Sequence, residues 1–182
     1  MWHNTVLTIL LFVISLNINA ADTRTELATF AGGCFWCVEA DFDKLFAINV
    51  KGVLWCAQAA AQQMIDQGGG KIITIGSMAS IFGLPFAAPY AATKGGVVQL
   101  SRVLATAWAA DNIQVNAYLP GWIETGQTAN IPQQMPGLHE KITERCLMGR
   151  WGKGADFAGI GVFLASSASD SMLNQPMLAS MA

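Results

Sequence analysis

The sequence predicts an α/β protein in which a small parallel sheet lies between long helices. The stretch Lys71–Ile75 is almost entirely apolar, as expected of a parallel strand with helices on both faces. Apolar residues recur at helical spacing over about 42–67 and about 89–110. A second apolar strand is expected at Ile113–Leu119. Strand, long helix and strand in this order predict a right-handed βαβ unit.

The composition is that of one apolar domain. Of the 182 residues, 53% are hydrophobic, which is enough to form a core. Charged residues make up 12%, about half the usual share, and the formal net charge is −2. The Lys and Arg residues are scattered and form no basic stripe. A nucleic-acid partner is therefore not expected.

Each long helix has a predicted end. Gly68-Gly69-Gly70 ends the first helix, and Asp111-Asn112 ends the second. Cys56 lies in the first helix among apolar residues, and we expect it to be a small core residue.

The region after the second strand is expected to be less regular. Residues 125–154 are richer in Pro, Gly and Gln, which predicts a mobile loop with a short helix near His139–Cys146. His139 invites a catalytic role, but a solvated loop histidine is the expected reading. A last helix is predicted over about 155–166, and the tail 171–182 shows no strand pattern.

The N-terminus carries an apolar run, Val6–Leu16. Its eleven residues are fewer than the about 20 that span a bilayer, but match the core of a signal peptide. Asn17–Ala21 would be the cleavage region, with cleavage after Ala20. The protein is then exported, periplasmic or secreted; otherwise it is cytoplasmic. An uncleaved anchor and a buried helix remain alternatives, because the first four residues contain no Lys or Arg.

Two cysteines follow a pair of glycines. Gly32-Gly33-Cys34 reads as a tight turn at a helix start, where backbone amides lower the pKa of a thiol. Glu39 could then protonate or hold an oxygen removed from sulfur. A structural disulfide between Cys34 and Cys37 is the alternative. No metal site is expected, because the other cysteines and the two histidines lack ligand-like spacing.

Tyr90 and Lys94 form the strongest candidate site. They lie four residues apart, on one face of a helix that starts near Ala88 or Pro89. A phenol with a reference pKa near 10 exchanges protons poorly at neutral pH unless a nearby ammonium stabilises its phenolate. Ser77, at the end of the first strand, could hold a carbonyl oxygen beside the phenol.

The order of these residues resembles the second half of a short-chain dehydrogenase/reductase, over about Asp43 to Asp170. The resemblance implies a catalytic tetrad of Asn49, Ser77, Tyr90 and Lys94. It also implies that the nicotinamide end of an NAD or NADP cofactor is touched by Tyr90, Lys94, Pro120, Gly121, Ile123 and Thr125. Asn116 matches a structural position. The fold implied is a truncated Rossmann-like βαβ with long helices flanking a small parallel sheet.

A second resemblance covers only about residues 29–45. Gly-Cys-Phe-Trp-Cys-Val-Glu-Ala is similar to the active-site motif of the A-type peptide methionine sulfoxide reductases. It implies that Cys34 is the nucleophile, that Phe35 and Trp36 form a methyl-binding wall, and that Glu39 is the acid. The later tyrosines, aspartate and resolving cysteines of that family do not follow.

The two resemblances predict a hybrid chain in four parts. Residues 1–20 are signal peptide-like, 21–42 are sulfoxide reductase-like, 43–170 are the dehydrogenase-like catalytic half, and 171–182 are an irregular tail. Dinucleotide binding also requires a glycine-rich turn after a first strand and an acidic residue about 20 positions later, and neither is recognisable. Only about two central strands are expected, with unpaired edges.

Three functions remain open at this point. The first is NAD(P)-dependent hydride transfer with a small carbonyl or alcohol substrate, impaired by the missing dinucleotide-binding half. The second is thiol chemistry at Cys34. The third is a non-catalytic fragment that associates as a homo-oligomer through its two long helices. No stable membrane anchor is expected after cleavage.

Overall fold

The computed structural model describes residues 9–10, 39–84, 86–126, 128–170 and 179–181. Its helices and strands follow one another in an alternating βα order. Their bounds are β1 Ile9–Leu10, α1 Glu39–Phe46, α2 Gly52–Asp66, β2 Gly70–Ile75, α3 Ala88–Ala107, β3 Ile113–Pro120, α4 Ile131–Gln134, α5 Leu138–Arg145, α6 Ala158–Ala165 and β4 Ala179–Met181. A π-helical segment, Ala47–Lys51, joins α1 to α2. Short 3₁₀ segments lie at Met78–Ser80, Ala109–Asp111, Gly154–Phe157 and Ser167–Ser169.

The four strands form one parallel sheet in the order β1-β2-β3-β4. β2 pairs with β3 along its whole length, from Gly70 opposite Ile113 to Ile75 opposite Tyr118. The predicted βαβ unit is therefore present as β2-α3-β3.

Two expectations about the sheet were wrong. The tail does contain a strand, because β4 pairs with Tyr118–Pro120 of β3. Among the described residues the sheet also has four strands and not two, because Ile9–Leu10, within the predicted signal-peptide core, pairs with Ile72–Ile73. Both additions are only two or three residues long and satisfy backbone groups at a sheet edge. Such short pairings leave no side-chain pattern to recognise.

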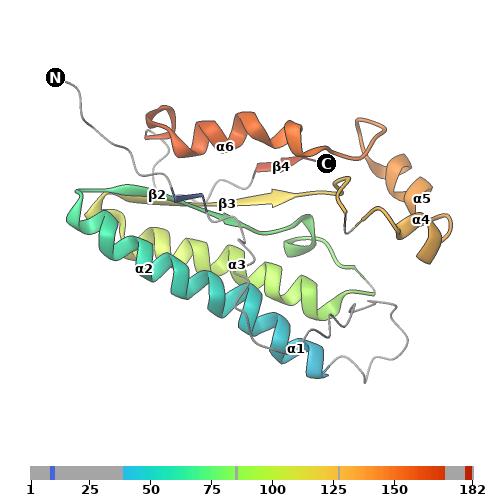
Figure 1. Ribbon diagram of the computed structural model, residues 1–182, viewed down its shortest axis with the longest axis horizontal. Helices are drawn as coiled ribbons and strands as arrows, with labels where there is room; N and C mark the ends of the chain where they lie inside the picture. The colour runs from blue at the N-terminus through green and yellow to red at the C-terminus, as the bar shows by residue number, and fades with distance from the viewer. Residues whose placement is uncertain (1–8, 11–38, 85, 127, 171–178, 182) are drawn as a thin grey trace, which may run out of the picture.

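Helices cover both faces of the sheet (Figure 1): α2 and α3 lie on one side, and α6 lies on the other. On the first side, Ile72, Ile113 and Val115 pack against α2 and α3. On the other side, Ile73 and Tyr118 pack against Leu164 of α6. Neighbouring residues of β2 thus enter opposite cores, which explains the unbroken apolar run of this strand.

The predicted helix ends are confirmed. Gly69 follows α2 with φ +142, and a Cβ there would lie 2.7 Å from the carbonyl oxygen of Asn112, so this position requires glycine. Asn112 itself is left-handed, with φ 56, and turns the chain from the 3₁₀ segment into β3.

The prediction for Cys56 was wrong, because its side chain is exposed and its thiol is free. The buried stripe of α2 consists of Ala57, Ala60, Ala61 and Met64, at the spacing i, i+3, i+4, i+7. Cys56 lies beside this stripe. An apolar sequence on every side of a helix does not show which side is buried.

An ion pair between a buried lysine and an exposed aspartate holds the segment after α6 against the start of β2. The Lys71 side chain is 9% exposed, and its Nζ contacts Asp170 Oδ1 at 2.5 Å. The same ammonium donates to Ser169 Oγ at 3.0 Å. This contact fixes the end of the sheet opposite to the one where Ser77 and Thr125 follow the strands.

Among the described residues, no helix is both long and apolar enough to cross a bilayer.

Candidate active site

Tyr90 and Lys94 lie on the first turns of α3, as predicted. Lys94 Nζ is 5.8 Å from the centre of the Tyr90 ring. The ammonium donates a hydrogen bond of 2.9 Å to the backbone carbonyl of Ile75, the last residue of β2. Burial lowers the pKa of Lys94 below the ordinary value of a lysine. The site thus holds a cation near a phenol at the carboxyl end of the sheet.

Ser77 follows β2 directly and caps the next 3₁₀ turn. Its Oγ accepts a hydrogen bond of 3.1 Å from the Ala79 amide. Ser80 Oγ accepts at 3.1 Å from the Ser77 amide and donates at 2.7 Å to the carbonyl of Lys94. Ser77 and Ser80 therefore form a capping box that is bonded to α3. Because Ser77 Oγ accepts here, it keeps its own proton for donation.

Asn49 lies in the π-helical segment between α1 and α2. Its Nδ2 donates a hydrogen bond of 3.0 Å to Thr93 Oγ1. Thr93 Oγ1 in turn donates one of 2.8 Å to the carbonyl of Tyr90. Thr93 is completely buried. Asn49 is thereby fixed to the turn of α3 that carries Tyr90 and Lys94. Single π turns inside helices are rare and are frequent at functional sites.

The segment after β3 follows the same edge of the sheet. Pro120 ends β3, and Gly121 and Ile123 are half-buried, while Thr125 is exposed. Ile123 forms a parallel bridge with Gly152, and the Glu124 amide donates to the Gly152 carbonyl at 2.9 Å. This bridge holds the segment against the loop before α6.

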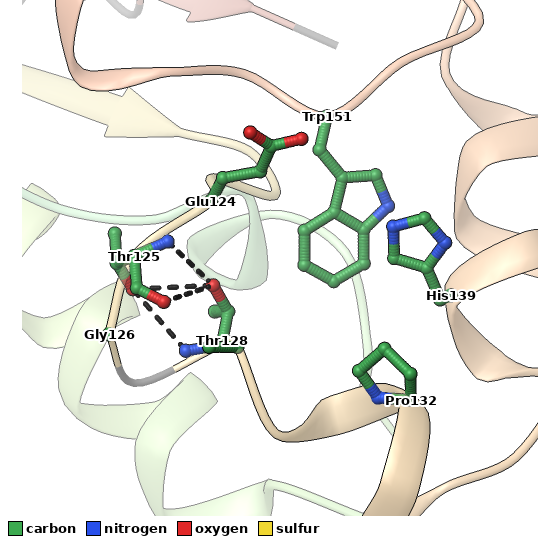
Figure 2. Close-up of a pocket in the computed structure, with 8 residues that line it drawn as sticks. Glu124, Thr125, Gly126, Thr128, Pro132, His139 and Trp151 are labelled. Atoms are coloured by element: carbon green, nitrogen blue, oxygen red, sulfur yellow. Dashed lines mark hydrogen bonds between the residues drawn. The ribbon is translucent and has the colours of Figure 1, made fainter.

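A pocket of about 560 Å³ opens beside this segment. Figure 2 shows its walls: Glu124, Thr125, Gly126 and Thr128 on one side, and Pro132, His139 and Trp151 on the other. Thr128 Oγ1 donates a hydrogen bond of 2.7 Å to the Ile123 carbonyl and accepts one of 2.8 Å from the Thr125 amide. The loop that carries Thr125 is therefore shaped by its own hydrogen bonds.

The prediction of a solvated His139 was wrong. The residue belongs to α5, is half-buried, and its ring stacks on Trp151 with 4.7 Å between centroids (Figure 2). Trp122, which follows β3, packs against Trp151 with 5.3 Å between the ring centroids. The indole of Trp151 supplies a large apolar surface on which the imidazole ring stacks, so the ring is only half exposed.

An ion pair fixes the loop that carries Trp151. Arg150 binds Asp156 through two hydrogen bonds, of 2.7 and 3.1 Å, and also donates 2.9 Å to the Trp151 carbonyl. The Lys153 amide donates to the same carboxylate. The bonds from Arg150 and Lys153 lower the pKa of Asp156 to about 2.

The structure ties the four tetrad candidates to α3 through two separate sets of hydrogen bonds, one around Asn49 and Tyr90 and one around Ser77 and Lys94. It does so through two residues that the sequence reasoning missed, Thr93 and Ser80. The spacing Ser77-x-x-Ser80 is a capping-box signal and could have indicated Ser80. No comparable local signal marks Thr93, because its partner is distant in sequence. The catalytic roles of the four residues remain predictions.

The residues of the predicted sulfoxide reductase site lie mostly outside the described part of the chain: Cys34, Phe35, Trp36 and Cys37 are not described, and Glu39 is the first residue of α1. Within the described part of the chain, no group of three His, Cys, Asp or Glu side chains could hold a metal ion.

Comparisons with known proteins agree with the fold. A family model described as Enoyl-(Acyl carrier protein) reductase matches residues 19–178. The chain is 44% identical over 133 residues to the 2-dehydro-3-deoxy-D-gluconate 5-dehydrogenase of Escherichia coli (strain K12), covering 72% of this chain and 52% of that protein. It is 36% identical over 137 residues to the 3-oxoacyl-[acyl-carrier-protein] reductase of Thermotoga maritima, covering 75% and 54%.

A solved structure resembles this chain in both fold and sequence. The gluconate 5-dehydrogenase of Burkholderia cenocepacia J2315, in complex with NADP and tartrate, superimposes with a TM-score of 0.73 at 37% identity. The match covers 78% of this chain and 55% of that one. The chain thus spans about half the length of the curated relatives it matches. On the family match and the shared fold, it belongs to the short-chain dehydrogenase/reductase family.

Proposed function

We propose that this chain carries the proton-transfer site of an NAD(P)-dependent oxidoreductase that interconverts a small alcohol and its carbonyl. One observation carries the proposal: Lys94 holds its ammonium 5.8 Å from the Tyr90 ring, at the carboxyl end of β2. Ligands of open α/β sheets bind at this end of the strands.

Each of the four tetrad candidates has a distinct role in the proposal. Tyr90 exchanges a proton with the substrate oxygen. Lys94 stabilises the phenolate form of Tyr90 as long as the Lys94 side chain is a protonated ammonium. Ser77 donates its hydroxyl proton to the same substrate oxygen, since its Oγ accepts from the Ala79 amide and keeps that proton. Asn49 fixes the turn of α3 through Thr93 and positions a relay water.

The residues at the carboxyl end of the sheet fit the nicotinamide end of NAD or NADP. Tyr90 and Lys94 would face the ribose, and the segment Pro120–Thr125 would face the ring, held in shape by Thr128 and Gly152. The cofactor supplies or accepts the hydride when it is bound. The described residues show no glycine-rich turn between a strand and a helix that would receive the pyrophosphate. We therefore propose that this chain alone binds the cofactor weakly and works slowly.

The substrate in this proposal is a small polyhydroxy acid or its ketone. Several relatives carry names of sugar-acid dehydrogenases, and the B. cenocepacia structure holds tartrate. The pocket beside Thr125 combines hydroxyl groups with the edge of an aromatic stack, a combination suited to a small hydroxylated molecule. Self-association through the long helices is part of the proposal, since Trp55 of α2 is 62% exposed and Val103 of α3 is 55% exposed.

The test is oxidation of gluconate in the presence of millimolar NADP or NAD. The rate is measured from the absorbance of the reduced cofactor that forms. Tyr90→Phe is expected to reduce the rate about 100-fold or more, the usual range for loss of a positioned acid or base. Tyr118→Phe is the matched control, because Tyr118 is the other tyrosine and lies in the core of β3. Equal rates for the unmodified chain and Tyr90→Phe would reject the proposal in favour of a non-catalytic chain.

Export remains a separate proposal. It is tested by expressing the full chain and determining the N-terminal residue of the protein in each cell fraction. A mature chain starting at Ala21 outside the cytoplasm supports cleavage after Ala20, and an intact Met1 in the cytoplasm rejects it. Thiol chemistry at Cys34 is tested by methionine sulfoxide reduction before and after alkylation, with Cys34→Ser as the variant.

A further inference from the structure

One buried donor in the pocket beside Thr125 has no acceptor. The Trp151 side chain lines this pocket, and the residue is 3% exposed. Among the described residues, its Nε1 is the one buried side-chain nitrogen or oxygen without a hydrogen-bond partner. Buried polar groups are nearly always paired, because an unpaired donor loses its bonds to water and gains none in return. An unpaired donor at the wall of a pocket therefore points to a ligand that supplies the acceptor.

The His139 ring covers the face of this indole. The two rings are nearly parallel, with an angle of 21° between their planes and 4.7 Å between their centroids. Figure 2 shows the imidazole beside the edge of Trp151 that carries the nitrogen. The N–H bond lies in the plane of the indole, and the stacked imidazole lies above that plane, so it does not act as the acceptor. His139 thus covers the donor without bonding to it.

The indole is held firmly. Trp122 packs against it with 5.3 Å between the ring centroids. The backbone on both sides is also fixed, since Arg150 donates to the Trp151 carbonyl and the Gly152 amide donates to the Trp122 carbonyl, each at 2.9 Å. Trp151 is therefore a rigid wall of the pocket.

The imidazole is held much less firmly. Within the part of the chain that the structure describes, no hydrogen bond reaches the His139 side chain; the bond from Thr143 goes to its backbone carbonyl. Its helix, α5, is eight residues long and buries one of them, Ile142. Segments with few buried apolar contacts open at the lowest cost in free energy. Of the two stacked rings, His139 is thus the one that can move.

The chemistry of the pocket favours an uncharged ligand oxygen. Its lining includes the carboxylate of Glu124 and the hydroxyl groups of Thr125 and Thr128, but no lysine or arginine. A ligand carboxylate would meet a like charge there without a cation to offset it. A hydroxyl group can instead accept from Trp151 Nε1 and donate to Glu124. The carbon side of a polyol also suits the flat apolar face of the indole.

We propose that His139 is a lid over Trp151 and that a polyol chain displaces it. The carbon side of the polyol takes the place of the imidazole on the indole, and one hydroxyl oxygen accepts the hydrogen bond from Trp151 Nε1. In a polyhydroxy acid, the end that enters the pocket is the one remote from the carboxylate. The proposal rests on the proposed function for the class of ligand, but it does not require turnover.

The indole hydrogen gives a direct readout on the unmodified chain. The chain has six tryptophans, so isotopic labelling of tryptophan gives six indole N–H signals in an NMR spectrum, and Trp151→Phe identifies the one that belongs to Trp151. Sorbitol is added without cofactor until the spectrum stops changing. The Trp151 signal should move downfield, as for a newly formed hydrogen bond, and the Trp108 signal, at the end of α3, should not. A Trp151 signal that does not move would overturn the proposal.

Gluconate tests which end of the ligand enters. Gluconate and sorbitol share the same chain of hydroxyl groups and differ at one end, where gluconate carries a carboxylate. Because the shared end is the one that enters, gluconate should move the Trp151 signal in the same direction. A shift with gluconate and none with sorbitol would mean that the pocket recognises the carboxylate, and would overturn the proposal.

Removing the lid gives a test by sign. The affinity for sorbitol is measured from the shift of the backbone amide of Thr128, which lines the same pocket. His139→Ala should tighten binding about threefold or more, because the open state no longer has to be reached from the covered one. His139→Phe keeps a flat ring on the indole and should not tighten it. Weaker or unchanged binding by His139→Ala would overturn the proposal, as would equal tightening by both variants.

Removing the donor should have the opposite effect. Trp151→Phe keeps an aromatic ring but lacks the N–H, and should weaken sorbitol binding about tenfold, as for the loss of one hydrogen bond. Trp108→Phe is the matched control and should bind like the unmodified chain, because Trp108 packs in the core between α2 and α3. Equal affinities of the two variants would overturn the proposal.

The outcomes for this proposal and for the proposed function are separate, because no readout above depends on turnover. Sorbitol binding of this kind in a chain that does not oxidise gluconate would reject the proposed function and leave the lid intact. Gluconate oxidation that depends on Tyr90, in a chain whose Trp151 signal never moves, would reject the lid and leave the proposed function intact.

Discussion

Two lysines lie at opposite ends of β2, where Lys71 is buried and Lys94 is half-buried, and they are held in different ways. Lys71 binds the carboxylate of Asp170 and the hydroxyl of Ser169. Lys94 binds a neutral backbone carbonyl, that of Ile75, and lies beside the Tyr90 ring. A carboxylate compensates the charge of a buried ammonium, whereas a carbonyl compensates it only in part. Burial lowers the pKa of Lys94 accordingly.

The difference separates a structural lysine from one available for chemistry. The bond between Lys71 and Asp170 joins the start of the sheet to the segment after α6 and needs no ligand. The ammonium of Lys94 retains donor capacity beyond its single carbonyl bond, since it has three protons. It lies at the end of the sheet where ligands bind in this class of fold.

The largest expected effect comes from removing each ammonium in turn. Lys94→Met should reduce gluconate oxidation about 100-fold, because the phenolate of Tyr90 loses its cation. Lys71→Met should leave the rate per folded molecule within about twofold. Steady-state rates, normalised to folded protein by circular dichroism, check both variants. Equal losses in the two variants would remove the distinction between the lysines.

The pH dependence should separate activity from stability at Lys94. Its lowered pKa means that the folded chain binds fewer protons than the unfolded chain between that pKa and the ordinary lysine value. The free energy of unfolding should therefore rise with pH across this window, while activity falls as the ammonium is lost. Urea unfolding and rates measured from pH 7 to 11 test the opposite signs. Lys94→Met is the control, in which this rise in stability should disappear.

A smaller effect is expected when Lys71 loses its partner. Asp170→Asn keeps the shape but removes the charge, and the free energy of unfolding should fall by about 1 kcal/mol. The figure is modest because the Asp170 side chain is 60% exposed, so water already screens the pair. Ser167→Ala is the matched control, because Ser167 is exposed and begins the 3₁₀ segment Ser167–Ser169 that precedes Asp170. A loss above about 3 kcal/mol would mean that the pair behaves as fully buried.

A similarly small effect on stability is expected when Lys94 loses its support by Ser80. Ser80→Ala removes the hydrogen bond to the Lys94 carbonyl and half of the capping box, which should cost about 1 kcal/mol of stability. The rate should change less than in Lys94→Met, because the ammonium keeps its bond to Ile75. Thermal unfolding with parallel rate measurements distinguishes the two effects. A rate as low as that of Lys94→Met would give Ser80 a direct role in proton transfer.

The sequence predicted those parts of the molecule in which pattern and burial agree. β2 and β3 are apolar because both faces are covered, and α3 begins at Ala88 with Pro89 in its first turn, so their positions followed from local signals. Ser77, Tyr90 and Lys94 could be picked out because they lie at the ends of these elements, whereas Asn49 was a candidate only through the family resemblance. Short edge strands were missed, since two or three residues of backbone pairing require no special side chains.

Side-chain orientation was the harder part. Cys56 was placed in the core because α2 is apolar on several sides, and only packing shows that the stripe of small residues is the buried one. His139 was expected in solvent because its partner, Trp151, lies in another segment that folds back through the Ile123–Gly152 bridge. Contacts between distant segments have no local signature.

The π turn at Ala47–Lys51 has a consequence for insertions and deletions in this helix. A π turn holds one residue more than an α turn, and each residue of an α-helix rotates the chain by about 100°. Because the wider turn spreads about one rotation over more residues, each of its residues rotates the chain by less than an α residue does. Deleting one residue from this segment would therefore make α1 and α2 a single regular helix and leave α1 facing α3. Asn49, inside the turn, would shift around the helix and lose its position opposite Thr93. The extra residue thus sets the direction of the Asn49 side chain, not the phase between the two halves of the helix.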